Sequence, residues 1–333
     1  MTRFHQSLSL VLVIVSIVGC SLAAAQVGPP LPPEVYAANH PFALATATTT
    51  RLFGMGGFVT CIPDAGFGNP AFAGGLTDIT AVLRTSTTDF DSGLKLTGEQ
   101  ASVAIPLKEN KRGLQITGFR LNTDNRLALP GGPPPLSLGF SEYDVAFHYG
   151  QRISDRWLVG IGVSPVFHTS VNVNVVGGPT ALSYTSSSDR GCRLGTVYDL
   201  GSRARLGAVY DRYDEDVTTP AGTLEFTSEE WVAGLAYQIH PCLLVAAEWQ
   251  QLTTEGTGTR NGDSGWRFGL EAMLDNNVTI RGGSNDGSLS LGLGLRGDRW
   301  NLNYAFIDDW NKDLTPALFG ASSTHQLEAN YRF

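Results

Sequence analysis

Over most of the chain, hydrophobic and polar residues alternate one by one. In one clear example, Trp300, Leu302 and Tyr304 fall on one face of the backbone, and Asn301 and Asn303 fall on the other. Side chains of a β-strand point alternately to its two faces, so a period of two residues indicates strands with one apolar and one polar or small face. The pattern predicts an all-β fold.

The alternation recurs in about fourteen segments. We predict strands at 76–89, 94–107, 113–123, 139–153, 156–171, 189–200, 203–213, 226–239, 241–252, 264–274, 277–285, 288–297, 299–308 and 322–333. Many strands separated by regular turns are typical of a β-sandwich or a β-barrel. The connections between the segments help to separate these two folds.

Short and long connections alternate along the chain. We predict tight turns at Ser154-Asp155, Gly201-Ser202, His240-Pro241, Asn276-Asn277 and Gly297-Asp298, and long loops at 124–138, 172–188, 214–225, 253–263 and 309–321. Membrane barrels have short turns at the periplasmic end and long loops at the extracellular end. We therefore predict a transmembrane up-and-down antiparallel β-barrel of about fourteen strands, with the long loops outside and both termini in the periplasm.

Aromatic residues favour the membrane barrel over a soluble sandwich, which would show the same alternation. Barrels carry girdles of aromatic residues where they meet the lipid headgroups. The apolar faces end near Trp157, Tyr198, Tyr210, Trp231, Trp249, Trp266 and Trp300. The last strand, with Tyr331 and Phe333, resembles the C-terminal assembly signal of bacterial outer-membrane barrels.

The composition excludes several other classes of protein. Charged residues make up 16% of the 333 residues and hydrophobic residues 42%, and there are 39 glycines. Soluble domains carry about 25% charged residues and about 7% glycine. The net charge of −8 argues against nucleic acid as a partner, because phosphate binding needs clustered cations.

The N-terminus indicates export. Arg3 precedes an apolar run from Leu8 to Val18, which is too short to span a bilayer. The alanines at 23–25 then provide a small-residue cleavage site, so we predict a signal peptide over residues 1–25. A lipoprotein signal with a lipid on Cys20 is the alternative. Export fits the outer membrane of a Gram-negative-type bacterium.

Residues 26–75 lack the alternating pattern and contain too few patterned apolar residues for a core of their own. The lumen of a barrel of about fourteen strands is too wide for its own side chains to fill. We therefore divide the chain into a signal peptide (1–25), an N-terminal plug or hatch inside the lumen (26–75) and an outer-membrane barrel (76–333).

Two short motifs stand out within the predicted plug: the glycines Gly54, Gly56 and Gly57, and the run Asn69-Pro70-Ala71. The glycines of the first motif permit backbone conformations that other residues rarely adopt. Pro70 favours an extended Asn69, whose side chain suits a turn. We expect this second motif near the first and last strands, acting either as a structural turn or as part of a gate. The plug or gate residues are Gly54, Gly56, Gly57, Asn69, Pro70 and Ala71.

The same segment resembles the hatch of a known family. Gly54-Met55-Gly56-Gly57-Phe58, then Asp64-Ala65 and Asn69-Pro70-Ala71, are similar to the N-terminal hatch of the FadL family of hydrophobic-compound transporters, which has PorV-type shuttle proteins among its relatives. Arg281-Gly282-Gly283 resembles a part of the family's closing strands. The resemblance implies an outer-membrane barrel with a plug, and a small hydrophobic ligand.

Six arginines fall on the predicted inward faces, together with Glu248, Glu271 and Glu328. They are Arg193, Arg205, Arg267, Arg281, Arg296 and Arg332. Charges inside the barrel avoid the cost of about 2–4 kcal/mol for an arginine facing lipid. The arginines either form a ladder of ion pairs that stiffens the wall, or offer a basic surface to an anionic head group such as a carboxylate.

Other motifs do not indicate chemistry. Cys61, Cys192 and Cys242 remain after signal cleavage; they allow one disulfide at most and suit small core positions. The histidines show no metal-ligand spacing. The Gly-x-Gly-x-x-Gly at 292–297 lies within a strand pattern and precedes no helix. We expect no metal, no cofactor and no enzymatic activity.

Together these features predict an outer-membrane channel for passive uptake of small hydrophobic compounds, gated by the plug. The alternatives are a PorV-type assembly or secretion shuttle protein and a structural barrel without a substrate. Outer-membrane lipid, lipopolysaccharide and the barrel-assembly machinery are the other expected partners of a monomeric barrel. A continuous apolar cavity would favour transport, and a polar-filled lumen would favour the alternatives.

Overall fold

The structure is a computed structural model. It describes residues 49–63, 68–91, 93–107, 111–127, 136–175, 180–188, 191–219, 222–256, 259–309 and 321–333. The predicted signal peptide, the first part of the predicted plug and Asp64-Ala65 lie outside these residues. No helix in the described part of the chain is long and apolar enough to cross a membrane.

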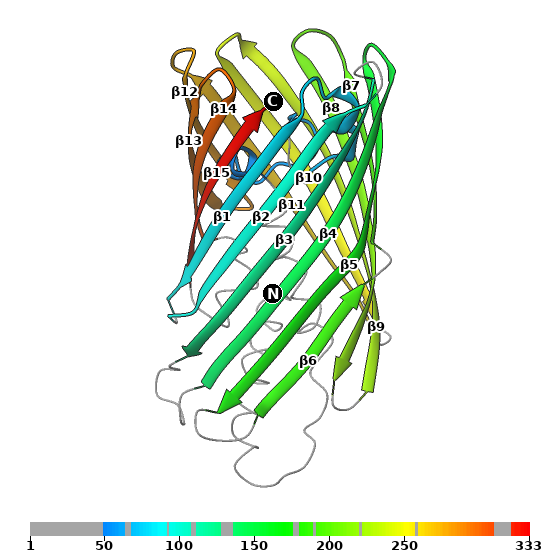
Figure 1. Ribbon diagram of the computed structural model, residues 1–333, viewed down its shortest axis with the longest axis vertical. Coiled ribbons are helices and arrows are strands. Elements are labelled where there is room, and N and C mark those ends of the chain that lie inside the picture. The colour runs from blue at the N-terminus through cyan, green and yellow to red at the C-terminus, as the bar shows by residue number, and fades with distance from the viewer. Residues whose placement is uncertain are drawn as a thin grey trace.

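Fifteen antiparallel strands form one closed wall (Figure 1). They are β1 (Thr80–Phe90), β2 (Lys95–Pro106), β3 (Arg112–Leu127), β4 (Leu136–Ser154), β5 (Trp157–Val175), β6 (Thr180–Ser188), β7 (Gly191–Asp199), β8 (Ala204–Thr219), β9 (Gly222–His240), β10 (Leu243–Gly256), β11 (Thr259–Met273), β12 (Val278–Asn285), β13 (Ser288–Arg296), β14 (Trp300–Asp308) and β15 (Ser322–Arg332). Pairing of β1 with β15 closes the barrel. Because β6 and β7 follow one another between β5 and β8, the fifteen strands fill fourteen positions, and the predicted barrel is confirmed.

The division between β6 and β7 coincides with an irregularity in β5. On β5, Ser164 pairs with Gly191 of β7 and Phe167 pairs with Ser188 of β6, so Pro165 lies at the break. Proline has no N–H for the ladder and is found at bulges. The sequence predicted one strand at 189–200 here and missed β6, because only Leu182 and Tyr184 mark an apolar face and serines and threonines make up most of the strand.

The apolar faces of the strands point outward, as predicted. On β14, Trp300, Leu302 and Tyr304 are exposed while Asn303 and Ala305 are buried inside the barrel. Exposed large apolar side chains on all the described strands except β6 and β10 form an apolar band around the wall, as a transmembrane barrel requires.

Two rows of aromatic residues border this band. Near one end of the barrel, Trp157 pairs directly with Tyr198 across β5 and β7, and Trp300 pairs with Tyr331. Toward the other end, a second row is made by Tyr210 and Trp231 on β8 and β9 and by Trp249 and Trp266 on β10 and β11. These pairs occupy the positions expected of the two headgroup girdles.

Three of the predicted long loops are largely strand. β5 continues to Val175 and β6 occupies Thr180–Ser188 within the predicted loop 172–188; β8 and β9 leave only 220–221 between them, and β10 and β11 leave only 257–258. Beyond the apolar band, polar and charged residues stand on both faces of β8, β9, β10 and β11, so the period of two weakens although the hydrogen-bonded ladder continues. The end of β5 keeps the alternation, with Val171, Val173 and Val175 between Asn172 and Asn174, and the prediction ended this strand too early. The predicted tight turns, in contrast, are confirmed: Ser154 and His240 are the last residues of β4 and β9, and the other three turns lie between strands.

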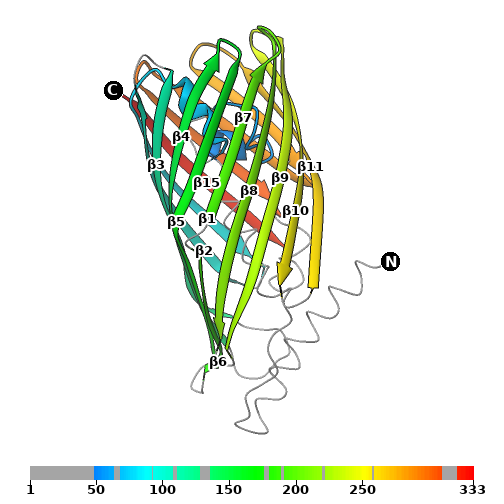
Figure 2. The same cartoon turned by 90° about the vertical axis from the view of Figure 1, so that its right-hand side faces the viewer.

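The end of the barrel that carries these tight turns and the C-terminus is called the short-turn end. Residues 49–63 and 68–75, called the inner segment, lie inside the barrel near this end (Figures 1 and 2). They contain the short helix α4 (Thr50–Phe53) and the 3₁₀ helix η1 (Pro70–Gly75).

Candidate functional site

The inner segment contacts both sides of the barrel. Helix α4 packs against β13, β14 and β15, whereas η1 packs against β2, β3, β4, β5 and β7. Thr49 caps α4 by accepting a hydrogen bond from the Leu52 N–H, and Gly54 follows the helix. Gly56 and Gly57 have φ angles of 105° and 82°, a region that favours glycine, and they redirect the chain along the wall.

Apolar side chains of the inner segment fill the lumen near the short-turn end. Phe53 packs against Ala305 and Ile307 of β14. On the other side of the segment, Met55 and Phe58 belong to a cluster that also includes wall residues Ala236 and Ala246. The side chains of Phe53, Met55 and Phe58 are fully buried. Burial of each is worth about 1.5–3 kcal/mol, so the segment and the wall share one core.

Glycines of the wall allow the backbone of the inner segment to lie directly on the strands. At nine inward positions, called the glycine belt, a Cβ atom would come into close contact with the segment. They are Gly113, Gly150, Gly160, Gly195, Gly207, Gly234, Gly269, Gly283 and Gly292, on nine different strands. The belt leaves no room for side chains between the inner segment and the wall. The surface of the wall is therefore complementary to the backbone of the inner segment at this position.

We predict that Gly195→Ala displaces the inner segment, because the new Cβ would overlap the Asn69 carboxamide. Overpacking of this kind costs about 1–3 kcal/mol. The apparent unfolding temperature on heating should fall, and cleavage of the segment by added protease should speed up. Gly118→Ala is the matched control, since a Cβ on this strand glycine would meet nothing within 4 Å. Equal behaviour of the two variants would contradict a tightly fitted belt.

Three carboxylates of the wall hold the segment, and those of Glu248 and Glu328 are buried. Glu328 Oε2 accepts a hydrogen bond from the Thr50 N–H at 3.0 Å. Glu248 accepts from the Thr60 N–H at 2.9 Å and from its hydroxyl at 2.6 Å. Arg51 makes a two-point ion pair with Glu271, with N···O distances of 2.8 and 2.6 Å. Because β10, β11 and β15 each supply one carboxylate, the segment is fixed at three separate points.

The side chain of Asn69 takes part in four hydrogen bonds. Its carboxamide NH2 donates to the carbonyls of Thr60, Thr196 and Ala208, at 3.0, 3.0 and 3.3 Å. Its Oδ1 accepts from the Ala71 N–H at 3.0 Å, and its backbone is extended before Pro70, as the sequence indicated.

The position of this motif differs from the prediction. Asn69, Pro70 and Ala71 lie against β5, β7 and β8 rather than beside the first and last strands. The reason is the route of the chain: α4 occupies the side of the last strands, and the segment has followed the wall to β7 by residue 69. The prediction that Gly54 adopts a backbone conformation that other residues rarely adopt is also wrong. Its φ is an ordinary −65°, and glycine is required because a Cβ would lie 2.9 Å from the Cα of Gly292.

Four of the six predicted inward arginines form ion pairs with acidic residues of the wall. Arg193 pairs with Asp211, Arg205 with Asp199, Arg267 with Glu248 and Arg281 with Glu271. Arg332 donates to the Asp298 carbonyl at 3.1 Å, and Arg296 is exposed beside a cavity at the short-turn end. Tyr331 and Phe333 lie on the outer surface at the same end, with ring centroids 5.0 Å apart.

Two polar cavities flank Arg51 at the short-turn end. One, of about 300 Å³, extends to Arg281, Arg296 and Asn303. The other, of about 400 Å³, extends to Arg205 and the buried Cys61. Both are lined in part by Arg51, so this side chain separates two openings beside the inner segment.

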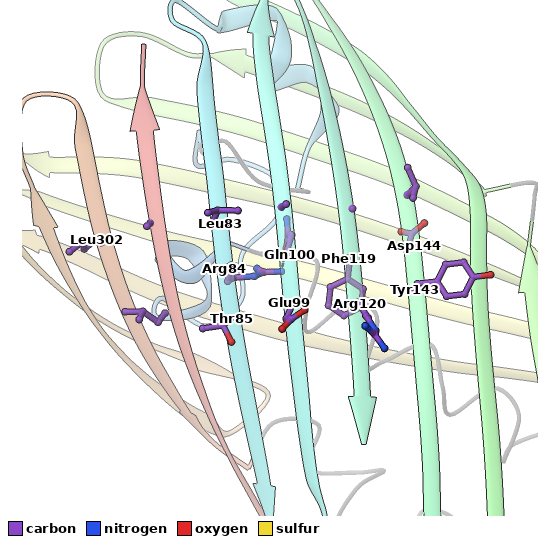
Figure 3. A pocket seen from close by; sticks show the side chains of 15 residues that line it. Leu83, Arg84, Thr85, Glu99, Gln100, Phe119, Arg120, Tyr143, Asp144 and Leu302 are labelled. Atoms are coloured by element: carbon purple, nitrogen blue, oxygen red, sulfur yellow. Dashed lines mark hydrogen bonds between the residues drawn. The ribbon is translucent and has the colours of Figure 1, made fainter. Parts of the chain in front are cut away.

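A larger and more apolar groove, of about 710 Å³, lies on the outer surface of the wall (Figure 3). Leu83, Tyr143 and Leu302 border it and are exposed. The small outward residues Ala101 and Gly118 leave it hollow. The groove faces the membrane, so it is separate from the lumen.

The three cysteines among the described residues, Cys61, Cys192 and Cys242, are free thiols. Cys61 belongs to the inner segment and is buried against the wall, and burial raises the pKa of its thiol to about 12, with a further contribution from Glu248. Cys242 is exposed in a turn at the short-turn end. In the described part of the chain, no group of three His, Cys, Asp or Glu side chains is placed to hold a metal ion.

The sequence had indicated the three anchoring glutamates only as partners for arginines. Their bonds to Thr50, Thr60 and Arg51 could not be read from strand parity. The glycine belt was missed too, although its members share the inward parity with the predicted lumenal charges. An inward glycine near the short-turn end of successive strands was the signal that could have revealed it.

The fold has close structural counterparts, although no known protein family and no curated protein matches the sequence. The toluene transporter TbuX of Ralstonia pickettii is similar with a TM-score of 0.62 and 15% identity, over 88% of this chain and all of TbuX. The toluene transporter TodX of Pseudomonas putida gives 0.56 and 14%, over 84% of this chain and 96% of TodX. A FadL homologue of Pseudomonas aeruginosa gives 0.57 and 13%, over 86% and 98%. The chain therefore has the barrel fold of the FadL-type transporters.

Proposed function

We propose that the chain is an outer-membrane channel, not an enzyme, through which small hydrophobic compounds pass without an energy source. The observation that supports it best is the inner segment across the lumen of a barrel that shares its fold with toluene transporters. We propose that this segment is the plug and that a local rearrangement at the short-turn end, beside Arg51, opens the route. The plug then belongs to residues 26–75 and the barrel to residues 76–333.

The proposed location is the outer membrane of a Gram-negative-type bacterium. The apolar band between two aromatic girdles supports contact with lipid, and lipopolysaccharide would meet the outer girdle. Tyr331 and Phe333 would serve as the signal for the barrel-assembly machinery. We propose a monomer, since closure by β1 and β15 leaves no open sheet edge in the wall.

We predict that the short-turn end faces the periplasm. In intact cells, a membrane-impermeant maleimide should label Glu225→Cys, on an exposed position near the far end of β9, but not the native Cys242. Permeabilising the outer membrane should expose Cys242. Labelling of Cys242 but not of Glu225→Cys in intact cells would mean that the orientation is inverted.

Uptake of labelled toluene by cells tests the proposed function. Cells that carry the full chain should take up toluene at low external concentration faster than cells that carry an empty vector. The barrier to measure is the lipopolysaccharide leaflet, so whole cells are better suited than vesicles of phospholipid alone. Equal rates would contradict the channel.

A closed structural or assembly barrel is the second candidate. It is favoured by the polar lining of both cavities beside the inner segment and by the fixed contacts of that segment. In that case toluene uptake would not depend on the protein, while loss of the protein would change the integrity or composition of the membrane.

A further inference from the structure

A group of buried acidic residues lines the lumen on one side of the barrel. Glu142 and Asp144 of β4, Asp211 and Glu215 of β8 and Glu230 of β9 point inward and are all buried. Charge interactions link Glu142 with Asp144 and Glu215, and Asp144 with Asp211. These five residues are called the acidic lumen cluster.

The cluster has far less positive charge than negative. Arg193 lies among these residues and forms a two-nitrogen ion pair with Asp211, with an Nε–Oδ2 distance of 2.7 Å. Among the described residues, no lysine or arginine forms an ion pair with Glu142, Asp144 or Glu230. Two arginines, Arg193 and Arg267, therefore act on five carboxyl groups, and Arg267 forms its ion pair with Glu248 outside the cluster.

Three carboxylate oxygens of the cluster have no hydrogen-bond donor in the part of the chain that the structure describes. They are Glu142 Oε1, Asp144 Oδ1 and Asp211 Oδ1. No other buried carboxylate oxygen among the described residues shares this property. Glu142 is 0% exposed and its other oxygen has a single weak contact, 3.5 Å from the Thr169 hydroxyl. A buried carboxylate oxygen without a donor is costly, and an ordered water or a bound ion completes such a group.

We infer that the acidic lumen cluster binds a positively charged group, carried by a hydrophobic amine in transit or by a free monovalent cation. An ammonium group offers N–H donors for the open oxygens of Glu142, Asp144 and Asp211, and a positive charge beside Glu142 and Asp144, which have no ion pair with another described residue. A multivalent metal is a poorer fit, because no three acidic, cysteine or histidine side chains of the described residues converge on one point. The inference rests on the proposed function, since it assigns a substrate class to the lumen of that channel.

The same arrangement acts against carboxylates. A fatty-acid head group in this part of the lumen would meet like charge, and the arginines that could receive it are already paired with Asp211 and Glu248. The channel should therefore discriminate between amphiphiles of similar size by the sign of their charge.

Binding of two matched probes to the purified full chain tests this inference. By titration calorimetry near neutral pH, 2-phenylethylammonium should bind at least about tenfold more tightly than 3-phenylpropanoate, because charge-assisted hydrogen bonds are worth about 1.4 kcal/mol or more. The double variant Glu142→Gln, Asp144→Asn should lose at least about tenfold in affinity for the ammonium probe. The control Glu225→Gln, exposed on the same barrel, should bind like the parent chain.

Unfolding temperature provides a second readout on the same samples. The ammonium probe should raise the unfolding temperature of the parent chain and not that of the double variant, which removes only unpaired charge and should fold.

Replacement of N-methylglucamine by potassium in the buffer separates a free cation from an organic amine as the ligand. If potassium competes with the ammonium probe, the site belongs to a free cation. If potassium does not compete, the site belongs to the organic amine. Equal affinity for both probes, or an unchanged double variant, would overturn the inference. Protein-dependent toluene uptake without ammonium binding would leave the channel standing and remove the cluster's role alone.

Discussion

Deletion of residues 26–68 is expected to leave a folded barrel that admits hydrophobic antibiotics and ions. The wall closes through its own ladder from β1 to β15, so it does not need the segment for closure. The deletion removes the fully buried Phe53, Met55 and Phe58 from the lumen. A barrel of this width without internal filling holds water. Antibiotic susceptibility of cells and conductance in planar bilayers should both rise clearly.

Folding of the deletion variant is checked by its heat-dependent mobility on gels. A folded variant with unchanged permeability, together with rapid periplasmic cleavage of the segment in the full chain, would show that residues 26–68 are a tether and not a plug.

Glu248→Ala is expected to loosen the inner segment without opening the wall. Glu248 receives hydrogen bonds from Val59 and Thr60 of the segment and pairs with Arg267 at 2.7 Å. Removing one partner of a buried ion pair costs about 3–5 kcal/mol, because the other charge stays buried. The segment should then leave its place in a measurable fraction of molecules.

Cys61 reports this change directly. In a chain with Cys192 and Cys242 replaced by serine, Cys61 should react slowly with a water-soluble maleimide, because it is buried and its raised pKa leaves little thiolate at neutral pH. The Glu248→Ala variant should label faster, and Glu99→Ala, on the outward face of β2, should not. Equal labelling of Cys61 in all three chains would mean that Glu248 does not hold the segment.

The sequence predicted the membrane part of the wall well and the polar ends of the strands poorly. Within the apolar band, the lipid-facing side of each strand is separated from the lumenal side, as on β14, and the period of two is visible. In β8 and β9 beyond Tyr210 and Trp231, both faces carry polar or charged residues, so strand and loop look alike in the sequence.

The candidate site was predicted in part. The expected lumenal position of the segment could be argued from the width of the barrel, but its contacts depend on which strands it reaches. Asn69 therefore appeared on the wrong side, and Glu248 and Glu328 appeared as partners of the wall alone. Such contacts between residues distant in the sequence depend on the path of the inner segment along the wall. The alternation of apolar and polar residues gives no information about that path.

The central claim is that small hydrophobic compounds enter the lumen. A crystal of the full chain exposed to bromobenzene tests it most directly, through the anomalous signal of bromine. The account predicts a bromine site enclosed by inward faces of the strands, on the far side of the inner segment from the short-turn end. Bromine bound only in the outer groove beside Leu83 and Tyr143, with none inside the barrel, would contradict it.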